Sequence, residues 1–168
     1  ESTHVKVRTL SGSQWSALNE ALFAVGPVAE SLRISEIMYH PAETGHPDDP
    51  NTEYIELTNI GAEAINLKLA RFTNGIAFTF PSVELAPGGH ILVVKSVMAF
   101  EDKYGPGLPV AGQYRGSLDN AGERVELQDA AGQVICSFRY RDGWYESTDG
   151  AGFSLTVRNP VTAEPNNL

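Results

Sequence analysis

Short runs of alternating apolar and polar residues, separated by glycine and proline, constrain the fold more than any other feature of this sequence. Among 168 residues the chain holds 16 Gly and 10 Pro, and the stretches between them are rich in Val, Ile, Phe, Tyr and Thr. In residues 123–128, for example, Val125 and Leu127 alternate with charged or polar neighbours, which puts the apolar side chains on one face of a strand. The pattern predicts many short strands, each burying one face.

At least seven such strands are expected after residue 31. They span residues 32–39, 53–59, 69–73, 76–80, 90–95, 123–128, 134–138 and 153–158. Along the last three, the side chains expected to face the core are Val125, Leu127, Val134, Cys136, Phe138, Phe153, Leu155 and Val157. The mostly apolar run at 90–95 favours a central strand that is covered on both faces.

Turn signals join neighbouring strands into hairpins. Asn74-Gly75 suits a tight turn because both residues tolerate a positive φ, and residues 129–132 (Asp-Ala-Ala-Gly) form a second hairpin signal. Residues 96–104 are the one plausible helix after residue 31, with Ser96 as its cap and with Met98, Phe100 and Tyr104 as apolar contacts. We therefore predict an all-β fold: an antiparallel β-sandwich at residues 32–160 with one short helix, followed by a tail at 161–168.

The first 27 residues form a separate unit in this interpretation. Val5 and Val7 indicate one strand, residues 21–25 a second, and Ser11-Gly12-Ser13 the turn between them, with residues 28–31 as a linker. A lone hairpin buries too little surface to be stable. It either packs on the main sandwich or is the closing hairpin of a preceding β-sandwich domain that is truncated here; we favour the second.

Charge and composition exclude several classes of function. Twelve Lys and Arg against 21 Asp and Glu give a net charge of −9, which argues against nucleic acid binding because phosphates would be repelled. The single cysteine, Cys136, forms no internal disulfide, so packing alone must hold the fold. The sequence shows no apolar run long enough to span a membrane.

The order of motifs resembles the bacterial lamin-tail domain over roughly residues 32–158. Two segments near the start carry the resemblance, Ile34-Ser35-Glu36-Ile37-Met38-Tyr39-His40-Pro41 and Glu53-Tyr54-Ile55-Glu56-Leu57-Thr58-Asn59. The resemblance continues, in the family's order, through five further motifs. They are Phe78-Thr79-Phe80-Pro81, Leu85-Ala86-Pro87-Gly88-Gly89, Ala99-Phe100 with Tyr104-Gly105, Gly116-Ser117-Leu118 with Asn120-Ala121-Gly122-Glu123, and residues 149–155. Residues 5–18, with Phe23, are similar to the end of a chitobiase-C-terminal or fibronectin-like domain.

This resemblance implies an immunoglobulin-like sandwich that serves as an accessory unit in large exported bacterial proteins. It implies an extracellular or cell-surface location, neighbouring domains in the same chain, and no catalytic residues common to the family. The chain lacks the heptad-repeat rod of animal lamins, so a role in nuclear filaments does not carry over.

The loop before residue 53 is rich in carboxylates. Asp48, Asp49 and Glu53 are candidate ligands for Ca²⁺, which prefers several oxygen ligands on a flexible loop. The alternative is a solvated polar loop, which we favour. A zinc site would need a third ligand beyond His40 and His46.

Catalysis has little support in the sequence. A hydrolase with its site in the loop between Tyr39 and Glu53 would need a nucleophile and a base, and none of the four histidines lies in a recognisable catalytic motif. Cys136 is expected to be a buried structural thiol.

Aromatic and basic residues gather in one expected loop. Trp144 and Tyr145, with Arg141 beside them, could stack on a sugar or anchor a protein interface; alternatively Trp144 caps the end of the sandwich. The sequence thus predicts a non-catalytic module that binds a protein or a cell-surface glycan or spaces other domains, with a calcium-stabilised adhesion module as the alternative. No cofactor is expected, apart from calcium in that alternative.

Overall fold

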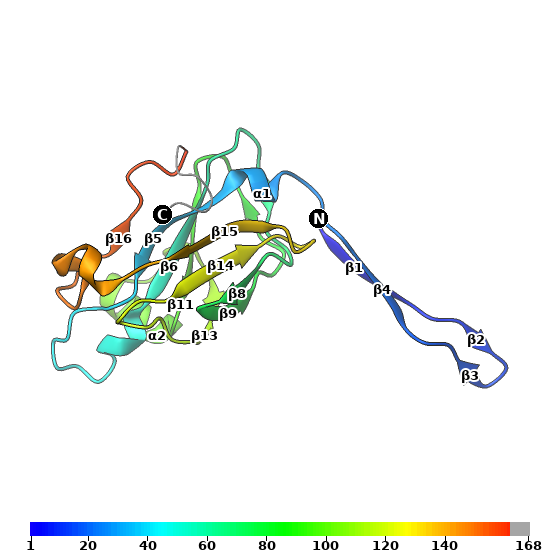
Figure 1. Cartoon of the computed structure of the whole chain (residues 1–168), viewed down its shortest axis with the longest axis horizontal. Coiled ribbons are helices and arrows are strands. Elements are labelled where there is room, and N and C mark those ends of the chain that lie inside the picture. Colours follow the sequence, from blue (N-terminus) through cyan, green and yellow to red (C-terminus); the bar gives the residue numbers. More distant parts are fainter. Residues whose placement is uncertain (162–168) are drawn as a thin grey trace.

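Two five-stranded sheets stack face to face and form the body of the molecule (Figure 1). The structure, a computed structural model, describes residues 1–161, so the tail expected at 161–168 lies outside the described residues except for Val161. The first sheet has the order β12-β11-β6-β5-β16 and the second β13-β9-β8-β14-β15.

The strands of the first sheet are β5 (Leu32–Met38), β6 (Tyr54–Asn59), β11 (His90–Val94), β12 (Val110–Gln113) and β16 (Leu155–Thr156). Those of the second are β8 (Arg71–Asn74), β9 (Ile76–Thr79), β13 (Arg115–Gly116), β14 (Arg124–Gln128) and β15 (Val134–Arg139). Two short strands, β7 (Ile65–Asn66) and β10 (Glu84–Leu85), pair beside them. Short 3-10 turns are η1 (Asp49–Thr52), η2 (Asp142–Trp144) and η3 (Glu146–Thr148).

The main core lies between the two sheets. Ile55 and Leu57 on β6 face it from one side, and Val125 and Leu127 on β14 face it from the other, and all four are fully buried. Full burial of such a side chain contributes about 1.5–3 kcal/mol. The all-β sandwich predicted from the alternation is therefore confirmed, as are the hairpins at Asn74-Gly75 and at residues 129–132.

Strand β11 is covered on both faces, as its apolar run predicts. Ile91 and Val93 belong to the main core, whereas Leu92 and Val94 pack against Phe100 of helix α2 (Val97–Tyr104) in a second, smaller cluster. The helix is capped where expected, because Ser96 Oγ accepts a hydrogen bond from the Ala99 amide at 3.3 Å. Since α2 carries the chain from one end of β11 back to the other, β12 runs parallel to β11, the one parallel pairing among the described strands.

Four of the apolar residues expected to make core or helix contacts are exposed: Val134 (43%), Phe153 (65%), Met98 (68%) and Tyr104 (37%). Tyr104 nevertheless packs its ring on those of Tyr54 and Phe100. A bulge explains Val134. Cys136 pairs with Leu127 but Val134 pairs with Gln128, so Ile135 is an extra residue that reverses the alternation, and Ile135 and Cys136 are both buried.

Phe153 and Met98 are exposed for a different reason. Phe153 precedes β16, which has only two residues and forms the edge of its sheet, so no second layer covers the start of the expected strand. Met98 lies on a helix that buries one face, and Phe100, two positions along, occupies that face.

Residues 1–27 form a hairpin that projects from the sandwich, which we call the arm (Figure 1). Strands β1 (Thr3–Val7) and β4 (Asn19–Phe23) pair along its shaft, and β2 (Leu10–Ser11) and β3 (Gln14–Trp15) pair at its tip. The residues expected as a linker form the single turn α1 (Val28–Ser31), and Val28 packs into the main core.

Two glycines with similar backbone angles allow a matched test of this packing. Gly122 has φ +98° and a Cβ there would lie 2.4 Å from the Tyr140 carbonyl oxygen, whereas Gly107 has φ +90° and open space around it. Both Gly→Ala changes introduce backbone strain of about 1 kcal/mol, and only Gly122→Ala adds a clash. We expect Gly122→Ala to lower the free energy of unfolding by at least about 1 kcal/mol more than Gly107→Ala in urea denaturation. Equal losses would contradict the packing described.

Candidate binding groove

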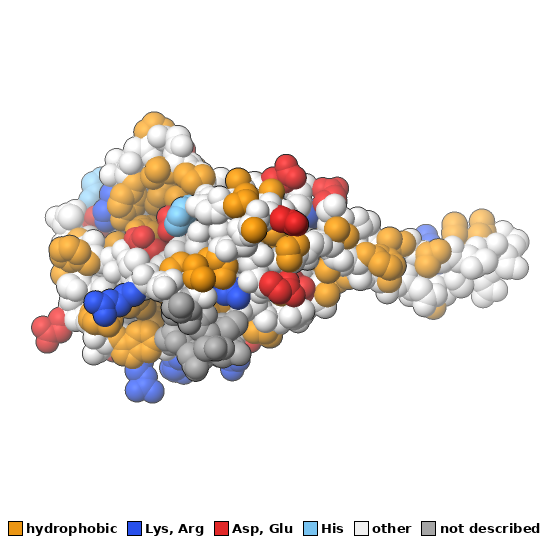
Figure 2. All heavy atoms as spheres, turned by 90° about the horizontal axis from the view of Figure 1, so that it is seen from above, with side chains coloured by type: hydrophobic (Ala, Val, Ile, Leu, Met, Phe, Trp, Pro, Cys, Tyr) orange, Lys and Arg blue, Asp and Glu red, His pale blue; other side chains and the backbone are white. Residues whose placement is uncertain are grey.

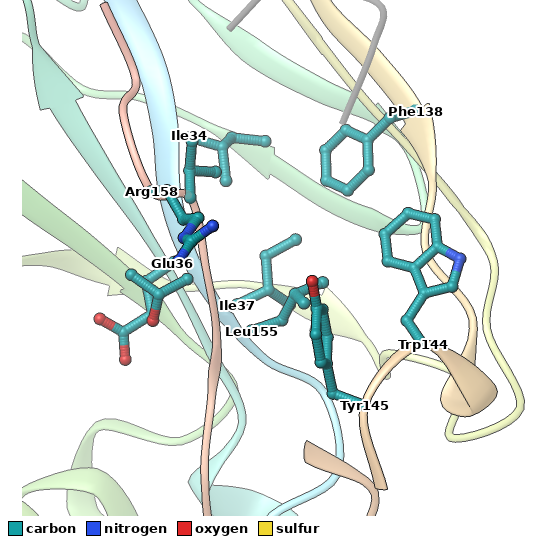
Figure 3. A pocket seen from close by; sticks show the side chains of 10 residues that line it. Ile34, Glu36, Ile37, Phe138, Trp144, Tyr145, Leu155 and Arg158 are labelled. Carbon is teal, nitrogen blue, oxygen red and sulfur yellow. The ribbon is translucent and has the colours of Figure 1, made fainter. Parts of the chain in front are cut away.

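A groove opens between the two sheets where β5 and β16 face β15 (Figure 3). Its volume is about 490 Å³. The lining residues come from β5, β15 and the segments around η2 and β16: Ile34, Glu36, Ile37, Phe138, Trp144, Tyr145, Leu155, Thr156, Val157 and Arg158. Most of these side chains are apolar, which is typical of a site that binds apolar groups.

The groove exists because the sandwich is not closed on this side. Strand β16 pairs with β5 only at Leu155–Ile37 and Thr156–Glu36, and one further bond, from the Val157 amide to the Ser35 carbonyl (2.8 Å), extends the contact. Strand β15 is the edge of the opposite sheet. Two sheet edges therefore face each other here, with Ile34, Ile37 and Phe138 buried in the core beneath the groove.

Aromatic rings form one wall of the groove. Phe138 comes from β15, Trp144 ends η2 and Tyr145 follows it, and Figure 3 shows these three across from Ile34 and Ile37. Trp144 is 39% exposed and Tyr145 61%, so both rings present surface to solvent. The predicted binding residues Trp144 and Tyr145 therefore line one groove, whereas Arg141 is exposed and lies outside the lining.

The loop that carries Trp144 is fastened to the end of β5. His40 Nδ1 lies 2.6 Å from Asp149 Oδ1, and Tyr39 Oη lies 3.1 Å from Thr148 Oγ1. The ring of Tyr39 packs on that of Tyr140 at 4.7 Å, and burial raises the pKa of Tyr39. The aromatic wall is thus held in place before any ligand arrives.

Sequence reasoning missed the opposite wall. Ile34 and Ile37 lie three residues apart, and a register shift between Ile34 and Glu36 turns both side chains inward, where each is only 2% exposed. Leu155 alternates like a core residue, and Arg158 stands at the end of the strand expected at 153–158. The alternation marks Leu155 as inward-facing, but only the brevity of β16 reveals that it borders a groove rather than a closed core.

The predicted calcium ligands do not form one cluster. Asp49 Oδ2 accepts hydrogen bonds from the Thr44 amide (2.6 Å) and the His46 amide (3.0 Å), and Asp48 Oδ1 accepts one from Asn51 (2.9 Å). Burial alone would raise the pKa of Asp49, but these hydrogen bonds, with those from the Thr44 hydroxyl, outweigh it and hold the pKa below its usual value. Within residues 1–161 no group of three His, Cys, Asp or Glu side chains could hold a metal ion. Calcium binding stays a prediction.

Glu53 points into the sandwich instead. Its side chain is 4% exposed, and its oxygens accept hydrogen bonds from Lys95 Nζ (2.6 Å), Ser117 Oγ (2.9 Å), Tyr114 Oη (2.8 Å) and the Leu118 amide (2.8 Å). Burial, followed by the nearby Glu53 carboxylate, raises the pKa of Tyr114, which keeps its phenol a donor. The sequence held a signal for this: Glu53, Ile55 and Leu57 alternate on the same face.

The groups weighed for catalysis have other partners. His4, His40 and His90 each contact a carboxylate, from Glu20, Asp149 and Glu56 respectively, and His46 Nδ1 accepts a bond from the Asp48 amide. Burial raises the pKa of the Cys136 thiol to about 12, so it is a buried structural thiol as predicted.

A family model described as the lamin tail domain matches residues 27–142, more than two-thirds of the chain. The chain belongs to the lamin tail domain family. This confirms the family part of the resemblance and, with the two stacked sheets, the predicted immunoglobulin-like sandwich. A search of curated proteins and a search of solved structures each gave no match.

The lamin tail match ends at Asp142, two residues before Trp144 of the candidate groove. It includes β5 and β15, but Trp144, Tyr145 and the whole of β16 follow it. The bacterial origin and the chitobiase-like character of the arm stay predictions. Among the described residues no helix is long and apolar enough to cross a membrane.

Removing the Glu53 carboxylate should destabilise this lamin tail domain strongly. Glu53→Ala leaves Lys95 and three further donors without their acceptor, so we expect the free energy of unfolding in urea to fall by about 3–5 kcal/mol. Glu53→Gln retains an acceptor oxygen and should cost less. The control Glu84→Ala removes an exposed carboxylate and should change stability by no more than about 0.5 kcal/mol. A loss for Glu53→Ala as small as that of the control would contradict the network.

Calcium should have little effect on folding, because the carboxylates of Asp49 and Glu53 are already bonded to donors of the protein. We expect the melting temperature to be the same in EDTA and in excess calcium. A rise with calcium that Asp49→Asn abolishes would instead support the calcium-stabilised adhesion module.

Proposed function

We propose that this lamin tail domain is a non-catalytic accessory module of a larger exported bacterial protein and that it binds a protein partner through the groove. The observation that carries the proposal is the half-open apolar groove with its prearranged aromatic wall. The export and the bacterial origin rest on the family resemblance alone.

The composition of the groove favours a protein ligand over a glycan. Its walls are formed by aliphatic and aromatic side chains such as Ile34, Phe138 and Leu155. Glu36 and Arg158 supply polar groups at one side (Figure 3), and Thr156 is the remaining polar residue of the lining. A glycan presents many hydroxyl groups, each of which loses water on binding and needs a partner. Apolar side chains of an extended protein segment need only this surface, and Trp and Tyr are the residues most enriched at the centres of protein interfaces.

The fixed loop supports binding as well. Because Asp149 and Thr148 tie the Trp144 loop to β5, little conformational entropy remains to be lost when a ligand arrives. A non-catalytic role agrees with the raised pKa of Cys136, since a buried thiol is not an activated nucleophile.

Selection from a displayed library of extended peptides, together with a glycan array, tests the ligand class. We expect the wild-type domain to select peptides rich in aliphatic and aromatic residues and Trp144→Ala to weaken their binding at least about tenfold, as for the central residues of an interface. The matched control is Trp15→Ala, which removes the tryptophan at the tip of the arm and should leave binding unchanged.

Ligand-induced changes in the NMR spectrum should fall on Ile34, Ile37 and Leu155. Glycan binding without peptide binding would overturn the ligand class. Binding of neither class, or peptide binding that Trp144→Ala leaves intact, would overturn the groove as the site and favour a spacer.

A further inference from the structure

The arm makes almost no contact with its own sandwich. Within the described residues its strands pair only with each other, and it extends away from the body in both views (Figures 1 and 2). Among residues 1–161, hydrogen bonds join it to the sandwich only at its base. There the Glu1 carboxylate accepts from Lys68 Nζ (2.8 Å) and Ser82 Oγ (2.5 Å), and the Pro27 carbonyl accepts from the Ser31 amide (3.1 Å). The arm is therefore held out from the body, not folded onto it.

Its two faces differ in character. The register pairs Val5 with Ala21, Thr3 with Phe23 and Val7 with Asn19. One face therefore carries Val5, Val7, Ala21 and Phe23, with the polar Thr3 and Asn19 at its two ends. On this apolar face Val5 is 42% exposed, Val7 59% and Phe23 57%.

The other face carries an ion-pair cluster beside Leu22, which pairs with His4 and is 41% exposed. Glu20 accepts from His4 Nε2 at 2.8 Å and lies 3.2 Å from Lys6 Nζ. A strand that is charged on one face and apolar on the other is the pattern of a sheet with one side buried and one side in water. This pattern indicates that the face carrying Val5 is normally covered by another layer of protein.

The arm also has two free edges. In the part of the chain that the structure describes, β1 pairs only with β4, so the outer backbone groups of both strands lack strand partners. An isolated two-stranded hairpin is marginal in water, and unpaired edges are templates for further strands. A partner that satisfies the arm must therefore do two things. It must offer backbone groups that hydrogen-bond to the free edge of β1 or β4, and it must offer an apolar surface that covers the face of Val5.

The arm has a different net charge from the rest of the chain. Lys6 and Arg8 balance Glu1 and Glu20, so residues 1–27 carry no formal net charge and the remainder carries the whole −9. An acidic neighbour that the body would repel can therefore meet the arm without that penalty.

We propose that the arm supplies two strands to the sheet of a neighbouring β-sandwich domain of the same polypeptide, whose strands extend the edge of the arm and whose second layer covers the Val5 face. A second copy of this chain fits less well, because two arms packed face to face leave all four edges unpaired, whereas two arms paired edge to edge leave both Val5 faces uncovered. A domain in the same polypeptide is covalently held beside the arm, at a high effective concentration. The inference is independent of the groove.

Hydrogen exchange tests the proposal in two samples, the chain of 168 residues and the polypeptide encoded by its gene with the neighbouring domain included. In the first, we expect the amides of β1 and β4 to exchange fast and Val7→Asp to leave the melting temperature of the sandwich unchanged. In the second, we expect the same amides to be protected at least about a hundredfold more and Val7→Asp to lower the melting temperature of the neighbouring domain. The matched control Lys6→Gln alters the charged face without placing a second carboxylate beside Glu20, and it should have little effect in either sample.

Three outcomes would overturn the inference. Arm amides that remain unprotected in the longer polypeptide would show that no neighbour covers them. Protection in the shorter chain that grows with concentration, together with dimers in analytical ultracentrifugation, would identify a second copy as the partner. Destabilisation of the sandwich itself by Val7→Asp would show that the arm packs on its own body.

Discussion

The buried carboxylate of Glu53 is the interaction on which the arrangement of the two sheets depends. Lys95 follows β11, Tyr114 lies between β12 and β13, and Ser117 and Leu118 follow β13, so four hydrogen bonds gather three parts of the chain at one point. A charge so far from water is tolerated only when its hydrogen bonds are complete, and these segments must therefore be in place together. The hydrophobic effect is not directional, so it drives formation of the core but does not fix where the segments between strands lie relative to it.

Local patterns were sufficient to predict most of the sandwich. Val125 and Leu127 on β14 and the turn at Asn74-Gly75 follow the sequence because alternation and turn chemistry act over a few neighbouring residues. The predictions failed where a partner strand decides the outcome. One extra residue, Ile135, reverses the orientation of Val134, and the short pairing of β16 leaves Phe153 uncovered.

Only the aromatic wall of the candidate groove could be predicted from the sequence. Trp144 and Tyr145 stand out because large aromatic residues in a loop are rare, whereas Ile34 and Leu155 look like ordinary core residues. A groove is defined by the separation of two sheet edges, and no property of a single strand encodes that distance. Glu53 is a different case, because its spacing with Ile55 and Leu57 does place it inside, and the assignment to the loop overlooked this alternation.

The solitary thiol has a consequence for where this fold can exist. Cys136 is enclosed by the core, burial raises its pKa to about 12, and no disulfide links any two parts of the chain. Thiolate is the form that oxidants and disulfides attack, so at neutral pH this sulfur takes almost no part in exchange with glutathione or other thiols. The stability of the sandwich is therefore indifferent to the redox potential of its surroundings. The same fold is reached in a reducing cytosol and in an oxidising medium, without an oxidase or isomerase to assist it.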